Sequence, residues 1–409
     1  MHTYLQPQIH AFMKILKKLT LAAALLLSHL SGSASDSLSI SLLTCTPGPV
    51  IYEQYGHTAI RVKSDNQDIV FNYGVFSFDE PFFAFRFAQG KTNYLLGVEY
   101  FKSFVEAYNK RGSFIYSQEI LLPQEDLNNL YSMLMRGSMP ANREYRYNIF
   151  YKNCTTCALD IIYKAAGKDI QYPALKEDFT TRDYLHKYND SFEYSKTGID
   201  LILGADADTV LSTENSYFLP MEAMILAQED STLFAGAEIL LTPDKPMVIR
   251  NSQITPAQLA LLVLLVIILL CMMEWYRGNI WWGIDIALFG IQGLAGIVIM
   301  FMTLFSEHPA TDANYLLIVL NPVPLCFLPA IIIKLKREEL DYFLIVEALV
   351  AFGFIIIQPF LPQYIDKAVI VLTAAIAIRS ISDVMISFFA KKIVEKRKNY
   401  LKQRRRVFD

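Results

Sequence analysis

The chain has 409 residues, enough for two or three domains of ordinary size, and 53% of them are hydrophobic. Its 37 Lys and Arg residues and 40 Asp and Glu residues give a formal net charge of −3. The basic residues are not interleaved with aromatic residues as on a nucleic-acid-binding face, so no nucleic-acid partner is expected.

Residues 1–35 have the pattern of a signal peptide. Three lysines precede an apolar core from Leu19 to Leu30, and small residues follow up to Ser35. This core is shorter than the roughly 20 residues that a transmembrane helix needs. We therefore predict export of the residues that follow, with an uncleaved anchor helix as the alternative.

Residues 36–255 form the predicted exported domain, which we expect to be α+β. Strand patterns cover 38–45, 58–63, 68–76 and 113–122, and helical patterns cover 123–135 and 154–167. The turn at 64–67 predicts a hairpin in which Ala59 faces Asn72. Because side chains alternate along a strand, His57 and Asn72 then share one face and lie diagonally adjacent.

Two cysteines begin the second predicted helix. Asn153 is a good N-cap, so Cys154 lies in the first turn, where free amide N–H groups and the helix dipole stabilise a thiolate. A redox CxxC pair, half of a metal site, or a nucleophile beside a packed Cys157 are all possible. The absence of a βαβ pattern or a second ligand pair, together with the upstream His57, favours the nucleophile. Whether Cys45 and Cys157 form a disulfide stays open.

The C-terminal half is predicted to be an all-α transmembrane domain over residues 256–390. Five apolar segments can span a bilayer, at about 257–273, 283–305, 315–333, 342–359 and 365–389. Alternate loops contain no Lys or Arg, whereas the tail 391–409 contains nine. By the positive-inside rule the tail is cytoplasmic and residues 36–255 are periplasmic, in a multi-pass protein of the inner (cytoplasmic) membrane.

Three segments carry a family resemblance: residues 55–62 (YGHTAIRV), 72–76 (NYGVF) and 153–156 (NCTT). They resemble the N-terminal periplasmic domain of the Lnb-type lipoprotein N-acyltransferase family, and the helical half fits that family's layout. A His on an early strand and a Cys at a later helix start are similar to circularly permuted NlpC/P60 (papain-like) thiol enzymes. The resemblance implies that fold for the exported domain.

The resemblance also implies an acyl transfer in two steps and no cofactor or metal. Cys154, with His57 as general base, would take an acyl chain from a membrane phospholipid as a thioester. The N-terminal cysteine amine of a diacylglyceryl lipoprotein would then accept it. Asn72 would orient the imidazole, and backbone N–H groups at the helix start would form an oxyanion hole.

Four further residues are candidates for substrate binding: Tyr55, Arg61, Asn153 and His308. Arg61 shares the His57 face and could hold a phosphate, and His308 lies on an outer loop on the predicted side of the active site. Two other functions stay open. One is a cell-wall peptidase or amidase of NlpC/P60 type that uses the same Cys154, and the other is a non-catalytic membrane scaffold.

Overall fold

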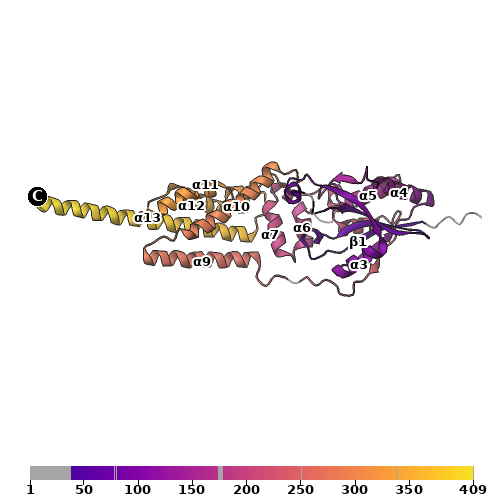
Figure 1. Cartoon of the computed structure of the whole chain (residues 1–409), viewed down its shortest axis with the longest axis horizontal. Helices are drawn as coiled ribbons and strands as arrows, with labels where there is room; N and C mark the ends of the chain where they lie inside the picture. The colour runs from indigo at the N-terminus through magenta and orange to yellow at the C-terminus, as the bar shows by residue number, and fades with distance from the viewer. Residues whose placement is uncertain are drawn as a thin grey trace, which may run out of the picture.

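The computed structural model describes residues 38–408 except for 78, 80, 174–177, 250 and 338, so the predicted signal peptide lies outside the described residues. The molecule is elongated (Figure 1). A domain of strands and helices forms one end, a helical bundle follows, and the C-terminal helix extends beyond the bundle. The expected α+β class of the first part and the all-α class of the second are both confirmed.

One antiparallel sheet organises the first domain. Its strand order is β6-β4-β3-β2-β1-β5-β7. The strands are β1 Ser39–Cys45, β2 His57–Lys63, β3 Asp68–Val75, β4 Asn93–Tyr100, β5 Ile115–Glu119, β6 Glu144–Arg146 and β7 Glu238–Leu241. β2 lies near the centre of the sheet, which fixes the position of its first residue, His57.

The β2–β3 hairpin has the predicted register, with Ile60 opposite Phe71 and Lys63 opposite Asp68. A bulge then interrupts the pairing of β3 with β4 between Tyr73 and Val75. The bulge lies at Gly74, whose φ of +95° favours glycine. The end of β3 is therefore irregular at the level of His57.

Helices cover both faces of the sheet because its side chains alternate between two apolar sets. The helices are α3 Phe101–Arg111, α4 Gln124–Gly137, α5 Cys154–Ala165 and α8 Pro220–Glu229. On one face Ile60 and Phe71 belong to a cluster with residues of α4, α5 and α8. On the other, Ala59 and Val70 pack with Phe104 of α3.

A third layer joins this domain to the bundle. It contains the short helix α2 Phe83–Ala88, together with α6 Thr181–Asn189 and α7 Glu193–Ile202. The backbone of Gly204 donates to Ala310 at 2.9 Å, and a Cβ at position 204 would lie 1.6 Å from the carbonyl oxygen of Asp312. The backbones of the first domain and of the membrane domain are therefore in direct contact at this point.

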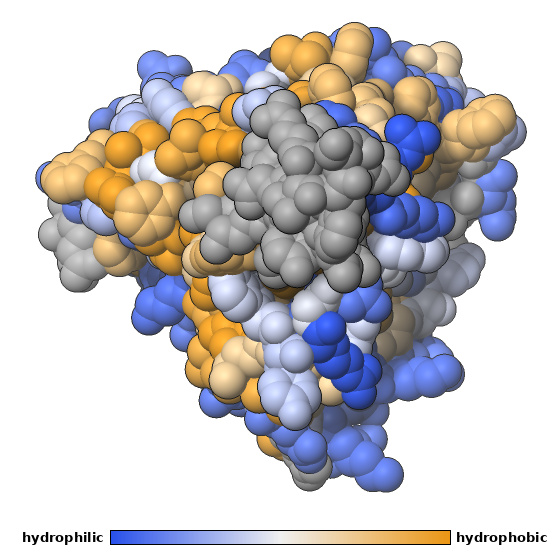
Figure 2. Space-filling model, turned by 90° about the vertical axis from the view of Figure 1, so that its left-hand side faces the viewer, coloured by the Kyte–Doolittle hydropathy of each residue, from blue (hydrophilic) through white to orange (hydrophobic). Residues whose placement is uncertain are grey.

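The predicted spans are confirmed: within the described part of the chain, five helical segments are long and apolar enough to cross a membrane. Their helices are α9 Pro256–Arg277, α10 Gly283–Phe305, α11 Val323–Lys336, α12 Tyr342–Ile357 and α13 Lys367–Phe408. The third span is broken: a short 3-10 helix, Tyr315–Ile318, precedes α11. Hydrophobic residues cover much of the bundle surface seen from its C-terminal end (Figure 2).

Charged side chains are buried in the bundle and join three of its helices. Arg379 and Asp383, one turn apart on α13, form an ion pair at 3.1 Å. Arg379 also donates two hydrogen bonds of 2.7 Å to Asp285 of α10 and pairs with Glu274 of α9. These four side chains are fully buried, so one guanidinium joins α9, α10 and α13 inside the bundle.

Candidate functional site

The candidate site lies where β2 begins, β3 bulges and α5 starts. Gly56, before β2, has a φ of +81°, and a Cβ there would lie 2.5 Å from the carbonyl oxygen of Cys45, so this turn requires glycine. At the bulge, a Cβ on Gly74 would lie 3.7 Å from the Cβ of Cys154. Gly56 thus fixes the turn that leads into His57, while the positive φ of Gly74 shapes the bulge, where a Cβ would be in ordinary contact with Cys154.

The start of α5 is fixed by Asn153, which is almost fully buried. Its Oδ1 accepts from the backbone N–H groups of Thr155 and Thr156 at 2.8 and 3.0 Å. Its Nδ2 donates to the carbonyls of Ile149 and Phe218 at 2.7 and 2.9 Å. This cap places Cys154 at the first position of the helix, as the sequence predicts.

Cys154 and His57 interact directly. Burial raises the pKa of Cys154. The charge of His57, the hydrogen bond between His57 and the Cys154 sulfur, and the hydrogen bond from the Thr58 backbone lower that pKa by more, so it lies below the ordinary value of 9.0. Burial lowers the pKa of His57, but the Cys154 charge and hydrogen bonds with Cys154 and Asn72 raise it overall. The two shifts favour a thiolate–imidazolium pair.

Asn72 completes the arrangement on the other side of the imidazole. His57 Nε2 donates to Asn72 Oδ1 at 3.1 Å, which leaves Nδ1 for the thiol. Asn72 Nδ2 donates in turn to Glu99 Oε1 of β4 at 2.7 Å, and this contact fixes which way the amide faces. The predicted proximity of His57, Asn72 and Cys154 is therefore present, and Glu99 extends it.

The sequence did not single out Glu99. The alternating apolar residues of 93–100 are a strand signal that could have located β4. Only the pairing of β4 with β3 shows that Glu99 reaches Asn72.

An aromatic ring and one arginine of α3 flank the imidazole. The ring of Tyr108 stacks on His57 with centroids 6.4 Å apart, and the Arg111 guanidinium lies 3.9 Å from the Tyr108 ring centre. Arg111 also pairs with Glu53 at 3.2 Å. Its positive charge opposes protonation of His57 and so limits the rise in the His57 pKa.

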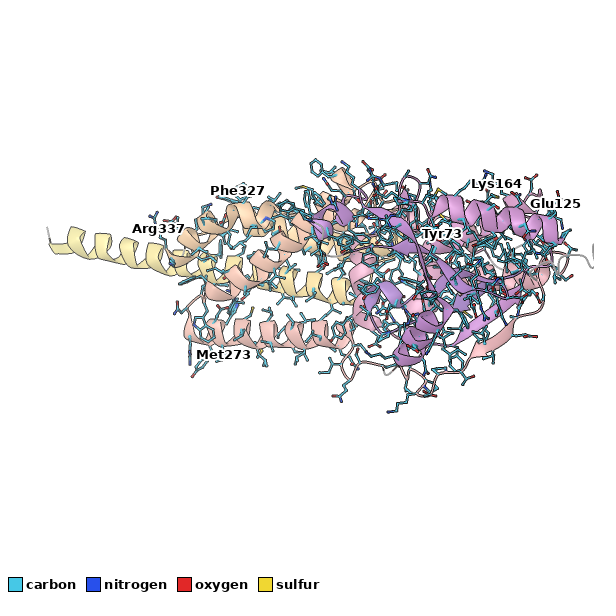
Figure 3. The ribbon with its side chains drawn as sticks, turned by 45° about the vertical axis from the view of Figure 1, so that its right-hand side comes forward. Tyr73, Glu125, Lys164, Met273, Phe327 and Arg337 are labelled. Atoms are coloured by element: carbon cyan, nitrogen blue, oxygen red, sulfur yellow. The ribbon has the colours of Figure 1, made fainter. Side chains whose placement is uncertain are left out.

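Cys157 differs from Cys154 although it lies one turn along the same helix. Burial raises the pKa of Cys157 to about 12. Its side chain lines a cavity of about 680 Å³ with Tyr73 and Lys164, which Figure 3 places on the sheet and at the end of α5 far from the bundle. All five cysteines are free, so Cys45 and Cys157 do not form a disulfide in this structure.

The predicted oxyanion hole is wrong in part. The N–H groups of Thr155 and Thr156 are used by the Asn153 cap, and that of Cys157 donates to the Asn153 carbonyl at 3.1 Å. Only the Cys154 N–H is left at the helix start for a developing oxyanion.

The four predicted substrate-binding residues have other partners. Arg61 forms a bidentate ion pair with Asp68 at 2.7 and 2.6 Å. The Tyr55 hydroxyl accepts from Asn189 at 2.9 Å, and Asn153 uses both its amide atoms in the cap. Arg61 and Asn153 thus have structural partners, the Tyr55 hydroxyl keeps its own O–H as a donor, and substrate binding by these residues stays a prediction.

His308 lies on the expected side of the membrane domain but has a structural contact. Its Nε2 donates to the carbonyl of Phe87 in α2 at 2.6 Å, and the two rings are 5.3 Å apart. His308 thus holds α2 against the end of α10 rather than reaching Cys154.

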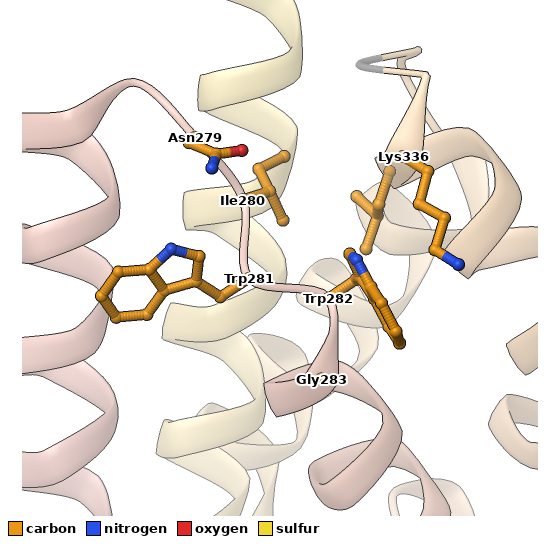
Figure 4. A pocket seen from close by; sticks show the side chains of 7 residues that line it. Asn279, Ile280, Trp281, Trp282, Gly283 and Lys336 are labelled. Atoms are coloured by element: carbon orange, nitrogen blue, oxygen red, sulfur yellow. The ribbon is translucent and has the colours of Figure 1, made fainter.

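A second cavity, of about 420 Å³, lies at the opposite end of the bundle. The turn between α9 and α10 lines it, with Trp281 and Trp282 pointing to different sides (Figure 4). Lys336 lies 4.1 Å from the Trp282 ring centre. Aromatic and cationic side chains are typical of a membrane interface, so this end suits contact with lipid headgroups.

Among the residues that the structure describes, no three His, Cys, Asp or Glu side chains are grouped as a metal site would need.

Two family models match the chain. The Lnb N-terminal periplasmic domain matches residues 29–187, and the Lnb transmembrane domain matches residues 249–392. The chain belongs to the Lnb family. No curated protein and no solved structure matches it significantly.

Membership of the Lnb family places the site in the cell. The protein is a multi-pass membrane protein with a periplasmic N-terminal domain. Cys154, His57 and Asn72 all lie within the match to the periplasmic domain. The site is therefore periplasmic.

Proposed function

We propose that this Lnb-family protein is a lipoprotein N-acyltransferase with Cys154 as its nucleophile. It would move an acyl chain from a membrane phospholipid to the N-terminal cysteine amine of a diacylglyceryl lipoprotein. The observation that carries the proposal is the lowered pKa of Cys154 beside His57, in a periplasmic domain packed on the membrane domain.

The first step forms a thioester. The Cys154 thiolate attacks the ester carbonyl of the lipid, so a C–S bond forms and the C–O bond breaks. Protonated His57 gives its proton to the leaving alkoxide of the lysolipid. The Cys154 N–H stabilises the oxyanion that develops on the carbonyl.

The second step transfers the acyl group. The lipoprotein amine attacks the thioester, a C–N bond forms and the C–S bond breaks, which regenerates the thiolate. His57, now neutral, takes the proton that the amine loses. Asn72 and Glu99 act as positioning residues, because they hold the imidazole with Nε2–H towards Asn72 through both steps.

The position of the site favours lipid substrates over the cell wall. Asn153 donates to Phe218, and Phe218 packs in a cluster that includes Ala310 of the membrane domain. Cys154 therefore lies at the end of α5 nearer the bundle, while α5 runs away from it (Figure 3). A peptidase or amidase acting on the wall would use the same thiol but has no need for this placement.

The test uses full-length protein in cells that lack any other N-acylating enzyme, with mass spectrometry of lipoprotein N-termini. The wild type and Cys157→Ser are expected to give triacylated N-termini, and Cys154→Ser only diacylated ones. In purified wild type, a hydroxylamine-sensitive acyl group should be found on Cys154. Triacylated lipoproteins in cells with Cys154→Ser would overturn the proposal.

A further inference from the structure

Helix α2 presents aromatic side chains to the surroundings. Phe82, just before it, is 81% exposed, and Phe85 is 54% exposed. Phe82 also has a φ of 55°, an uncommon conformation for a residue with a side chain. Large exposed rings on a short helix between two strands need a partner that covers them.

The anchoring of α2 fixes its depth relative to the membrane domain. The Ser306 hydroxyl donates to the carbonyl of Ala88 at 2.7 Å, and the Glu307 N–H donates to that of Gln89 at 3.0 Å. Phe85 packs on Phe301 of α10 with ring centroids 5.3 Å apart. These contacts tie α2 to the periplasmic end of the second span.

Phe301 lies inside that span, which ends at Phe305. Four residues of helix correspond to about 6 Å along the axis. Helices that bind membranes in the interface bury their apolar face about 5–10 Å into the boundary of headgroups and acyl chains. Phe85, which packs on Phe301, therefore lies about one helical turn inside the end of the span, within the depth that such helices reach.

A row of aromatic rings leads from α2 towards the site. In order it is Phe87, Phe83, Phe76, Tyr94 and Tyr147, with successive centroids 6.1, 5.4, 4.9 and 4.1 Å apart. We call these residues the ring row. Tyr147 leads to the start of α5, because Asn148, the next residue, pairs by two backbone hydrogen bonds of 3.0 and 3.1 Å with Lys152, two residues before Cys154. The ring row thus connects the edge of the membrane with the candidate nucleophile.

We propose that α2 is embedded among the acyl chains of the outer leaflet and that an acyl chain of the donor lipid reaches Cys154 along the ring row. The first half of this proposal, the position of α2 in the leaflet, rests on the contacts of α2 with α10. The second half, the path of the acyl chain along the ring row, rests on the proposed acyl transfer. The partner is the hydrocarbon of the bilayer, because the exposed side chains that meet it are phenylalanines at the end of a span.

Quenching by brominated lipid tests the first half without any catalysis. Full-length Phe85→Trp and Tyr100→Trp proteins are placed in vesicles of phosphatidylcholine with brominated acyl chains. Tyr100 is 74% exposed and ends the strand that Asn93 begins near α2, so it is the matched control. The three native Trp residues are common to both variants and cancel in the comparison.

Phe85→Trp is expected to show stronger quenching than Tyr100→Trp. Equal quenching would overturn the placement of α2 in the leaflet, whether or not the protein transfers acyl groups. Failure of the proposed function would leave this measurement unchanged, so the two failures can be told apart.

The second half is tested by the ratio of two rates, acylation of Cys154 by membrane phospholipid and by a soluble short-chain ester. This ratio is expected to fall about tenfold or more in Phe83→Ser and Phe76→Ser, because each variant removes one ring of the ring row and with it apolar contact with the acyl chain. Tyr100→Ser should keep the wild-type ratio. Unchanged ratios in both phenylalanine variants would contradict entry along the ring row.

Discussion

Cys154 and Cys157 show how local contacts decide the chemistry of a thiol. The two lie one turn apart on α5 and both are partly buried. Only Cys154 has His57 and the Thr58 N–H beside it, whereas Cys157 has Asp160, whose charge raises its pKa further. Helix position alone therefore does not distinguish them, and the strand that brings His57 does.

The pH dependence of alkylation tests this pairing. The rate at which iodoacetamide modifies Cys154 should rise with pH through a midpoint below 9.0, because the pKa of Cys154 is lowered. In His57→Gln the midpoint should move upwards, since the imidazolium charge is lost and burial, which raises the pKa, remains. The rate at pH 7 should then fall about tenfold or more.

The Cys154→Ser protein supplies the background from the other thiols. A midpoint that is the same in wild type and His57→Gln would mean that the imidazole does not ionise the thiol.

Prediction from sequence succeeded at the residue scale where short-range periodicity was enough. The turn at 64–67 and the alternation along two strands placed Asn72 beside His57 correctly. The partner of Arg61 was not foreseen: Asp68 lies directly across the hairpin from Lys63, and it forms a bidentate ion pair with the Arg61 guanidinium.

At the scale of elements, the cap of α5 links folding to the site. Asn153 satisfies two N–H groups of its helix and two carbonyls outside it, so it fixes both the start and the direction of α5. The same cap sets the position of Cys154, the first residue of the helix. Loss of the cap should therefore affect stability and thiol reactivity together.

Asn153→Ala should lower the free energy of unfolding by about 0.5–2 kcal/mol, the usual cost of a lost N-cap, and slow the alkylation of Cys154 at pH 7. Thr180→Ala is the matched control, because Thr180 caps α6 with the same capping-box geometry. Thr180→Ala should lower the free energy of unfolding by a similar amount and leave the alkylation rate of Cys154 unchanged. Chemical denaturation and iodoacetamide kinetics measure the two effects, and slowed alkylation in both variants would argue against a specific role for Asn153.

Elements with a strong local pattern were predicted well, and those defined by distant pairing were not. The hairpin, α5 and the five spans follow from periodicity and length. β6 has three residues, and β7 pairs with β5 from more than a hundred residues away, so neither has a local signal. The break in the third span fits Gly296 of α10, where a Cβ would lie 2.3 Å from the carbonyl carbon of Asn321.

At the scale of the whole molecule, the junction explains how a periplasmic site can be held near a membrane. Gln363 donates to Leu203 and Asn314, and Asn314 donates to Leu201, at 2.9–3.1 Å. Backbone and side-chain contacts from several loops therefore join the two parts. The cytoplasmic position of the C-terminus stays a prediction from the charges of the loops.

Arg379 holds the opposite end of the bundle together. Its guanidinium contacts Asp285 and Glu274 on two other helices and Asp383 on its own, and none of these side chains is exposed. Removing one partner from a buried ion pair costs about 3–5 kcal/mol, because the remaining charge is left without a counterion. Arg379→Met should therefore lower the stability of the membrane domain by about that amount, measured by thermal unfolding in nanodiscs.

The control is Lys336→Met near the same end, where the side chain is exposed and its charge lies over the Trp282 ring. Lys336→Met should change the free energy of unfolding by no more than about 0.5 kcal/mol, as most surface substitutions do. If the loss of stability in Arg379→Met comes from carboxylates left without a counterion, adding Glu274→Gln, Asp285→Asn and Asp383→Asn should restore most of that stability. No recovery in the combined variant would mean that the guanidinium stabilises the bundle by packing rather than by neutralising its three acidic neighbours.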